Sequence, residues 1–225
     1  MNTLAGLTIL MSGGSRGIGL AIAVRAARDG ANVALLAKTD TPHPRLEGTV
    51  HTAAAAIRDA GGAALAVVGD VRDDAAIARA VQETAETFGG IDIVVNNASA
   101  IDISGTLALD PKRYDLMQDV NARGTFMLSR AAIPQLLRAG SPQILTLSPP
   151  LNLAPWWLGA YPGYMVSKYS MTLATLGLAH EFADQGLRPN CDVPSDTSRD
   201  PLTCVRRVRH GLLPQWLGLP SEPEG

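Results

Sequence analysis

The sequence has few of the residues that build disulfide frameworks and metal centres. Its two cysteines, Cys191 and Cys204, both fall near the end of the chain, so most of the sequence has no thiol for a disulfide or a zinc cluster. It has four histidines, and none of them forms the helical pair that binds zinc. The sequence therefore predicts no metal site.

An excess of charge of one sign is also missing. The 19 basic and 21 acidic residues give a formal net charge of −2, which indicates no nucleic-acid or membrane-surface partner. No apolar run approaches the roughly 18 residues that span a bilayer. The first residues, Met1 to Leu4, lack the charged flank of a signal peptide. We therefore expect a cytoplasmic protein.

Short apolar runs alternate with amphipathic segments along most of the 225 residues. The runs are too short for helices and end in turn residues, as buried parallel strands do. The expected strands are 7–11, 33–36, 65–68, 91–95, 144–147 and, more weakly, 187–193. The expected helices are 16–28, 52–60, 74–88, about 111–137 and about 164–182.

This alternation predicts an α/β fold with a doubly wound parallel sheet, Rossmann-like, in a single domain. We expect residues 1–190 to form a domain that binds a nucleotide and carries out catalysis. Residues 189–225 hold six of the 15 prolines and both cysteines, and residues 191–225 form an atypical C-terminal segment. Natural divergence, truncation and a change of reading frame would each give such a segment. In a doubly wound sheet, ligands bind beyond the carboxyl ends of the strands.

A glycine-rich turn, residues 12–19, follows the first strand and opens the first helix. In this context, Gly13 permits a sharp turn, Gly17 lets the backbone approach a pyrophosphate, and Gly19 lets the helix pack closely on the sheet. The phosphate would face the N-terminus of the helix. The alternative is an ordinary glycine turn without a ligand.

The end of the second strand indicates which dinucleotide this site prefers. Lys38 and Arg16 provide two cations where a 2′-phosphate would lie, so we predict NADP (NADPH) as cofactor and regard NAD as less favoured. Asp40 stands at about the spacing of the acid that binds ribose in NAD sites. It lies two residues past the strand, and we interpret it as a loop acid. The alternative for Lys38 is a solvated cation at a strand end.

Tyr164 and Lys168 are four residues apart in an expected helix, and so lie on one face of it. An ammonium near a phenol lowers the pKa of the phenol and makes it a usable general acid or base. Ser148 ends the fifth strand at the ligand-binding edge, where its hydroxyl could bond a substrate carbonyl. We expect Tyr161 and Tyr169 to be packing or rim residues.

Together these motifs resemble the short-chain dehydrogenase/reductase superfamily. The residues that carry the resemblance are Ser12 to Gly19, Asp70-Val71, Asn96 to Ser99, Asn121, Ser148 and Tyr164 to Lys168. The insert at 38–49 and the run at 148–153 further resemble the branch named hydroxysteroid dehydrogenase-like protein 2. The resemblance spans residues 7 to about 190.

The resemblance implies a role for each of these residues. Tyr164 would donate the proton, Lys168 would lower its pKa and hold the nicotinamide ribose, and Ser148 would position the carbonyl. Asn121 would hold a water that links Lys168 to solvent. The implied cofactor-binding residues are Gly13, Ser15, Arg16, Ile18, Gly19, Lys38, Asp70, Val71, Asn97, Ala98, Ser99 and Thr197. Asp70 and Val71 would face adenine, and Thr197 would contact the carboxamide.

An apolar stretch between Ser148 and Tyr164 favours a small apolar carbonyl or alcohol as substrate. Its apolar residues are Pro149, Pro150, Leu151, Leu153, Pro155, Trp156, Trp157 and Leu158. They would equally suit a buried or dimer-facing surface. The resemblance leads us to expect a homodimer or homotetramer. The alternative function is a nucleotide-binding protein with little or no turnover; an epimerase or dehydratase would need a larger C-terminal domain.

Overall fold

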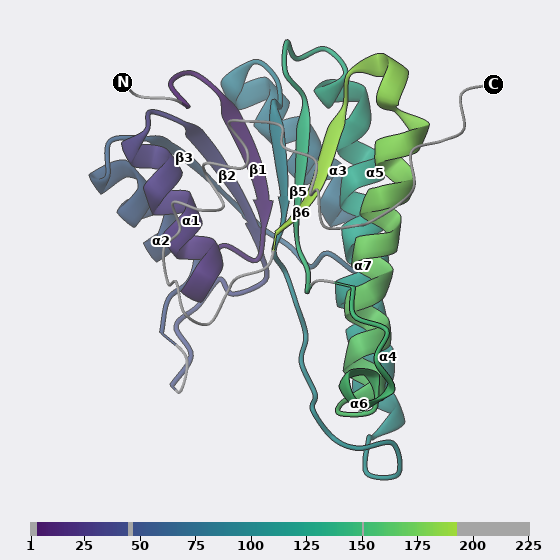
Figure 1. Ribbon diagram of the computed structural model, residues 1–225. Helices are drawn as coiled ribbons and strands as arrows, with labels where there is room; N and C mark the ends of the chain where they lie inside the picture. The colour runs from purple at the N-terminus through teal and green to yellow at the C-terminus, as the bar shows by residue number, and fades with distance from the viewer. Residues whose placement is uncertain (1–3, 45–46, 150, 193–225) are drawn as a thin grey trace, which may run out of the picture.

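The computed structural model describes residues 4–44, 47–149 and 151–192 of the chain (Figure 1). Its six strands form one parallel sheet in the order β3-β2-β1-β4-β5-β6. The strands are β1 (Thr8–Ser12), β2 (Asn32–Ala37), β3 (Ala63–Val68), β4 (Ile93–Asn96), β5 (Gln143–Leu147) and β6 (Arg188–Asp192). This order and direction confirm the predicted doubly wound α/β fold.

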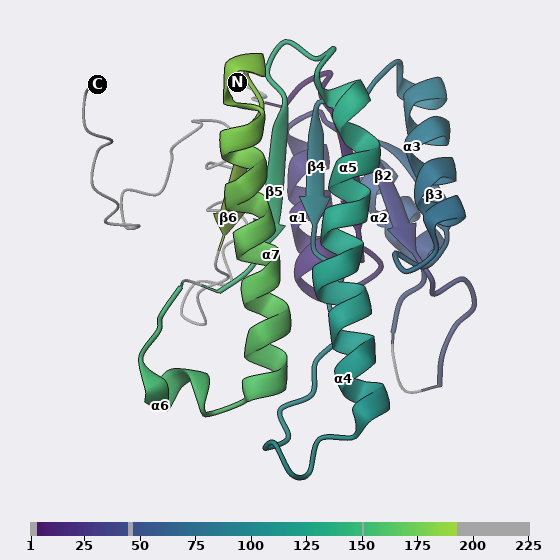
Figure 2. The ribbon, with the colours of Figure 1, turned by 90° about the vertical axis from the view of Figure 1, so that its right-hand side faces the viewer.

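Helices cover both faces of this sheet (Figures 1 and 2). The α-helices are α1 (Gly17–Arg28), α2 (Val50–Asp59), α3 (Asp74–Phe88), α4 (Pro111–Met117), α5 (Gly124–Leu136), α6 (Pro155–Leu158) and α7 (Pro162–Glu181). A π-helical segment, η1 (Gln118–Arg123), joins α4 to α5, and a 3-10 turn, η2 (Ala183–Gln185), follows α7. Among the described helices, none combines the length and the apolar character needed to cross a membrane.

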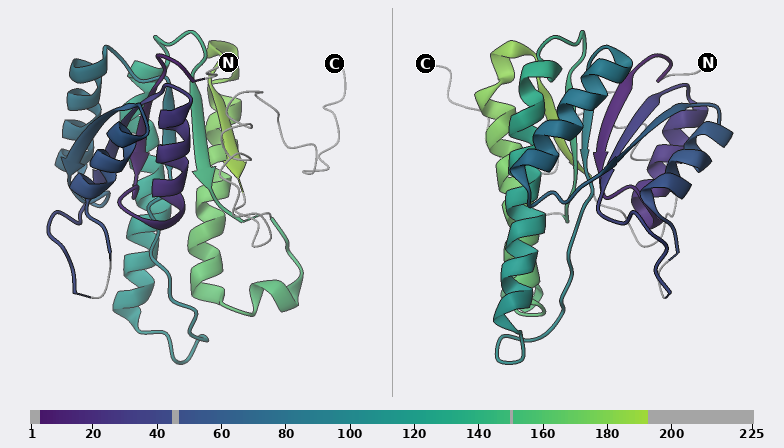
Figure 3. Two further views of the ribbon diagram at one scale, coloured as in Figure 1. Left: turned by 90° about the vertical axis from the view of Figure 1, so that its left-hand side faces the viewer. Right: turned by 180° about the vertical axis from the view of Figure 1, so that it is seen from behind.

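Two hydrophobic cores lie on opposite faces of the sheet, because successive strand residues point to opposite sides. Ile9 and Met11 of β1 pack with Ile22 of α1 and Ile57 of α2 on one face. Leu10, between them in sequence, packs on the other face with residues of α3, α5 and α7. Figure 3 shows α1 and α2 on one side of the sheet and α3, α5 and α7 on the other.

The structure differs from the sequence-based prediction in two elements. The expected helix 111–137 contains the π-helical segment η1, in which Asn121 bonds outside its own helix. The short helix α6 begins at Pro155 inside a segment for which no helix was expected. Strand β6, Arg188–Asp192, lies within the weak strand expected at 187–193. The remainder of the atypical segment, with Cys204 and Thr197, lies outside the described residues.

Candidate active site

The glycine turn after β1 packs directly against the loop that follows β4. Gly13 has a positive φ of 73°, and a Cβ on it would lie 2.7 Å from the Ala98 Cα. A Cβ on Gly19 would lie 2.4 Å from the Asn97 side-chain nitrogen. That nitrogen donates hydrogen bonds to the carbonyl oxygens of Ser12 and Gly13 at 3.2 and 2.7 Å. A Cβ atom at residue 13 or 19 would therefore clash with the loop that follows β4.

Gly17 has a different environment within the same turn. Its φ is +57°, and a Cβ there would meet nothing within 4 Å. The glycine is required by its backbone conformation, since L-residues rarely adopt positive φ. The space over it is open, as the backbone approach of a bulky anion at a helix N-terminus requires.

A cavity of about 410 Å³ opens beside this turn, at the carboxyl ends of β1 to β4. The strand order reverses between β1 and β4, which is the switch point at which doubly wound sheets bind ligands. The cavity is lined by Gly13, Ser15, Arg16, Ile18, Gly19, Leu36, Ala37, Lys38, Thr39, Gly69, Asp70, Val71, Asn97, Ala98, Ser99, Ala100, Leu116 and Val120. Every cofactor-binding residue expected from the sequence, except Thr197 outside the described residues, is thus brought to one cavity.

Arg16 reaches across this cavity to the segment that follows β2. Its Nη2 donates to Thr39 Oγ1 and to the Gly48 carbonyl oxygen, both at 3.2 Å. Its Nε is buried and has no hydrogen-bond partner among the described residues. A buried, charged donor without a partner is costly, and an anion is the partner that would satisfy it. Together with the nearby Lys38, Arg16 therefore fits a phosphate.

Asp70 at the end of β3 is already paired with a cation. Arg72 Nη2 donates to Asp70 Oδ2 at 2.8 Å, and the Arg72 backbone amide donates to Oδ1 at 3.0 Å. The side-chain hydrogen bond from Arg72 is the largest cause that holds the pKa of Asp70 below its ordinary value, against an opposing effect of burial. Asp70 is therefore ionised, and its lone pairs are shared between Arg72 and any ligand in the cavity.

The side-chain amide of Asn121 joins the loop after β4 to α7 by hydrogen bonds. Its Nδ2 donates to the Ala100 carbonyl oxygen and to Ser167 Oγ, both at 2.9 Å. Its Oδ1 accepts from the Ala100 amide at 2.7 Å. Both amide hydrogens are thereby used, and the expectation that Asn121 holds a water that links Lys168 to solvent stays a prediction. The amide fixes the loop that carries Ala100 against α7.

Ser148 does not face the cavity. Its side chain is buried, its hydroxyl donates to the Lys168 carbonyl oxygen at 3.0 Å, and it contacts Thr172 Oγ1. Both partners belong to α7, which packs over the end of β5. The hydroxyl is thus bonded to α7, and the contact of Ser148 with a substrate carbonyl stays a prediction.

The hydroxyl that lies beside Tyr164 is that of Ser99. Partial burial raises the pKa of the Tyr164 phenol, and the hydrogen bond from Ser99 opposes that rise. Ser99 lines the cavity at the end of β4. The run Asn96-Asn97-Ala98-Ser99 drew attention to this loop in the sequence, but only the packing of α7 on it shows that Ser99 meets Tyr164.

Lys168 lies one turn beyond Tyr164 on α7 and is 7% exposed. Its Nζ donates to the Leu147 carbonyl oxygen at 2.6 Å. Burial lowers the pKa of Lys168 to about 8, and Cys191 of β6 acts in the opposite direction. Lys168 is not among the groups that shift the pKa of Tyr164, which is raised. Burial thus moves the pKa of the phenol opposite to the expected direction in this structure, and the role of Lys168 stays a prediction.

Tyr169 fastens the apolar segment to α7. Its phenol oxygen accepts from the Asn152 amide at 2.9 Å and donates to the Asn152 carbonyl oxygen at 2.7 Å. Asn152 Oδ1 in turn accepts from the Ala154 amide just before α6. We call these two hydrogen bonds between Tyr169 and Asn152 the clamp. The segment that follows it carries Trp156, which is 72% exposed, and Trp157; their ring centroids are 5.8 Å apart and the rings are edge to face.

Tyr169→Phe is expected to lower the free energy of unfolding by about 1–3 kcal/mol, because both backbone groups of Asn152, which are partly buried, lose their partner. The tryptophan emission should also shift, since Trp156 and Trp157 follow the released segment. Chemical unfolding followed by tryptophan fluorescence measures both effects, with Tyr161→Phe as a control outside the clamp. A Tyr169→Phe protein with the stability and emission of the parent would contradict the clamp.

A parallel sheet with a glycine turn and a cavity at its switch point defines a Rossmann-type α/β protein. The chain belongs to the short-chain dehydrogenase family, whose model matches residues 7–203. Within that family it belongs to the branch of hydroxysteroid dehydrogenase-like protein 2. The protein of that name from Danio rerio is 55% identical over 179 residues, which are 80% of this chain and 43% of the relative. The chain thus spans about two fifths of the length of such relatives.

Two solved structures have folds similar to that of this chain. A short chain dehydrogenase from Mycobacterium thermoresistibile is 51% identical, with a TM-score of 0.84, and the match covers 90% of this chain and 72% of that one. An NADH-dependent reductase complexed with NAD is 28% identical, with a TM-score of 0.73, and the match covers 86% of this chain and 80% of that one. In the described part of this chain, no group of three or more His, Cys, Asp or Glu residues could hold a metal ion.

Proposed function

We propose that this protein is an NADP-dependent oxidoreductase that interconverts an apolar carbonyl compound and its alcohol by hydride transfer. The observation that carries the proposal is the hydrogen bond of Tyr164 with Ser99, a residue that lines the cavity together with the glycine turn and two cations. A proton donor near a cavity that could receive the cofactor is the arrangement that carbonyl reduction needs.

The cofactor would supply the hydride from its nicotinamide ring. Tyr164 donates the proton to the carbonyl oxygen, and with its pKa raised above the ordinary value of 10.0 the phenol is protonated at neutral pH. Lys168 has three ammonium hydrogens, of which one is given to the Leu147 carbonyl oxygen. The other two are available to the nicotinamide ribose and to the charge that develops on Tyr164.

Ser148 and Asn121 serve this chemistry as positioning residues. Ser148 bonds the Lys168 carbonyl oxygen and so holds the middle of α7 on β5. Asn121 bonds Ala100 and Ser167 and so holds the loop of Ser99 against the turn of α7 that carries Tyr164. The hydroxyl that orients the carbonyl together with Tyr164 is then that of Ser99.

The preference for NADP rests on charge. Lys38 and Arg16 are the cations that line the cavity, and Arg16 Nε is a buried donor without a partner in the described structure. Two cations suit a 2′-phosphate better than the two hydroxyls of NAD. The NADH-dependent reductase noted above has the same fold at 28% identity, so fold alone does not decide the preference.

An apolar substrate is supported by the segment next to Tyr164. Leu153 and Trp156 expose 74% and 72% of their surface there. Exposed apolar side chains beside a polar site favour an apolar ligand or partner. A homodimer or homotetramer in the cytoplasm remains our expectation for the assembly.

The test is the oxidation of NADPH by the purified protein with a panel of apolar aldehydes and ketones, followed by absorbance. Turnover of at least one apolar ketone or aldehyde, and of none of the matched polar sugars, is expected. The second candidate, a nucleotide-binding protein without turnover, is favoured by the inward bond of Ser148 and predicts NADPH binding with no oxidation on any carbonyl. That result would reject the oxidoreductase proposal.

A further inference from the structure

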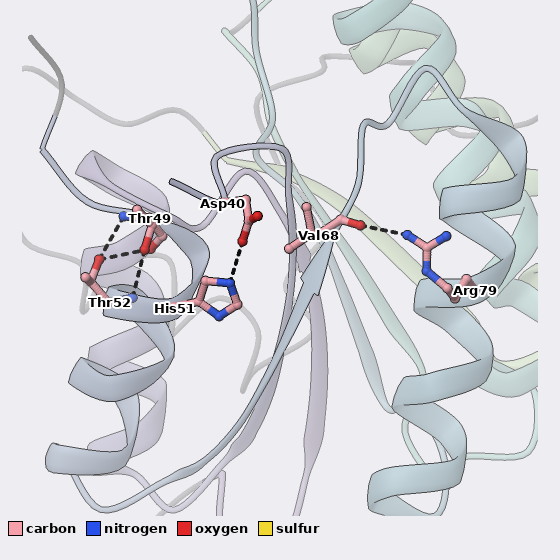
Figure 4. Close-up of polar contacts among 6 residues, drawn as sticks. All are labelled: Asp40, Thr49, His51, Thr52, Val68 and Arg79. Atoms are coloured by element: carbon pink, nitrogen blue, oxygen red, sulfur yellow. Dashed lines mark hydrogen bonds and ion pairs between the residues drawn. The ribbon is translucent and has the colours of Figure 1, made fainter. Parts of the chain in front are cut away.

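A hydrogen bond between two side chains lies just outside the part of the cavity that would receive the 2′-phosphate. Asp40 Oδ1 accepts from His51 Nε2 at 2.7 Å (Figure 4). Asp40 follows Lys38 and Thr39, which both line the cavity, but Asp40 itself does not line it. The carboxylate is directed to the first turn of α2 instead, as Figure 4 shows.

Hydrogen bonds hold the backbone of the first turn of α2 in place, and His51 belongs to this turn. Thr49 and Thr52 form a reciprocal capping box, with hydrogen bonds of 2.8 and 3.1 Å between side chains and backbone amides. The Val50 amide donates to the Thr39 carbonyl oxygen at 2.9 Å, so the turn is also bonded to the strand end that precedes Asp40. His51 therefore meets Asp40 from a fixed position.

The position of Asp40 matters because an acid shortly after the second strand binds ribose hydroxyls in NAD sites. The same carboxylate would repel a 2′-phosphate. With Asp40 turned to His51, the charged residues that line the cavity in the described part of the chain are Lys38, Arg16 and Asp70, and Asp70 is paired with Arg72. Two other cations close by are engaged elsewhere, since Arg72 pairs with Asp70 and Arg79 donates to the Val68 carbonyl oxygen (Figure 4).

We propose that His51 determines cofactor selectivity by holding the Asp40 carboxylate on α2, away from the 2′-phosphate of NADP. This role rests on the proposed NADP site but concerns a different pair of residues. It makes His51 a specificity-determining residue that touches neither the substrate nor the reacting atoms. Asp40 and His51 act as one unit, so the effect of changing one depends on the other.

The test is a fluorescence titration of the full chain with NADPH and separately with NADH, for the parent and for His51→Ala, Asp40→Asn and the double variant. His51→Ala is expected to weaken NADPH about fivefold and to leave NADH unchanged or tighter, because the released carboxylate faces the phosphate in a water-like dielectric. Asp40→Asn/His51→Ala should restore NADPH affinity to within about twofold of the parent, since no charge is left to repel. Thermal unfolding of each variant checks that α2 remains folded.

The outcomes separate this role from the proposed function. A His51→Ala protein whose ratio of NADPH to NADH affinity stays within about twofold of the parent would overturn the inference. So would a double variant that remains as weak for NADPH as His51→Ala. If the parent binds both cofactors equally and His51→Ala still shifts the ratio toward NADH, the role of His51 stands and the NADP preference fails. If the parent binds neither cofactor, both are rejected.

Discussion

Tyr164→Phe is expected to lower the turnover of a carbonyl substrate by about 10³-fold, within the range that a positioned proton donor contributes. NADPH affinity should stay near that of the parent, because Tyr164 is not among the residues that line the cavity around Arg16 and Lys38. Steady-state rates and a separate NADPH titration measure the two effects independently.

The matched control for this variant is Tyr161→Phe, which removes a phenol oxygen just before α7 without touching the pair of Tyr164 and Ser99. The control should retain the parent rate. A Tyr164→Phe protein that turns over at the parent rate would remove Tyr164 from the acid role, whatever its effect on binding.

The double variant Arg16→Ala/Lys38→Ala is expected to weaken NADPH by about 10²-fold and NADH only a few fold, since two charge-assisted contacts to phosphate are lost. Arg16 Nε is the buried donor that an anion would satisfy, and Lys38 lies beside it at the end of β2. Fluorescence titration with each cofactor gives the two losses.

The control for the double variant is Lys112→Ala, which removes a cation from the start of α4, outside the cavity lining. NADPH affinity should be unchanged by that substitution. Equal losses of NADPH and NADH in Arg16→Ala/Lys38→Ala would show that these cations bind the shared pyrophosphate and do not distinguish the 2′-phosphate.

The sheet could be predicted from the sequence because local patterns decide it. The run Leu7 to Met11 is apolar without alternation and is followed by glycines, and β1 occupies Thr8–Ser12, one residue further along. The glycine turn could be predicted for the same reason, since the conformation of Gly13 and Gly17 is a local property of the backbone. Because the strands are parallel, the residues that follow each strand then lie at the same edge of the sheet.

The hydrogen-bond partners of α7 and of the residues packed against it could not be predicted in the same way. Ser148 is correctly placed at the end of β5 by the sequence, but the direction of its hydroxyl depends on how α7 packs on the strand. Tyr169 has the spacing of a packing residue, and only the fold brings it to the backbone of Asn152. The π-helical turn at Asn121 likewise depends on the bonds to Ala100, which is distant in sequence.

The pKa values of the reacting groups depend on burial, which the sequence reports poorly. Helical spacing places Tyr164 and Lys168 on one face, and an ammonium near a phenol would lower the pKa of the phenol. In the structure both groups are partly removed from water, so burial raises the pKa of Tyr164 and lowers that of Lys168 to about 8. Desolvation is therefore the largest cause of both pKa shifts in this structure.

The most direct measurement is the titration of the unmodified protein with NADPH and, separately, with NADH, followed by nucleotide fluorescence. It requires no knowledge of the substrate and reports on the cavity that Arg16 and Lys38 line. We predict tight NADPH binding and NADH binding weaker by at least about tenfold, the effect of one charge-assisted contact. Tighter binding of NADH, or no binding of either nucleotide, would contradict the assignment of this protein as an NADP-dependent oxidoreductase.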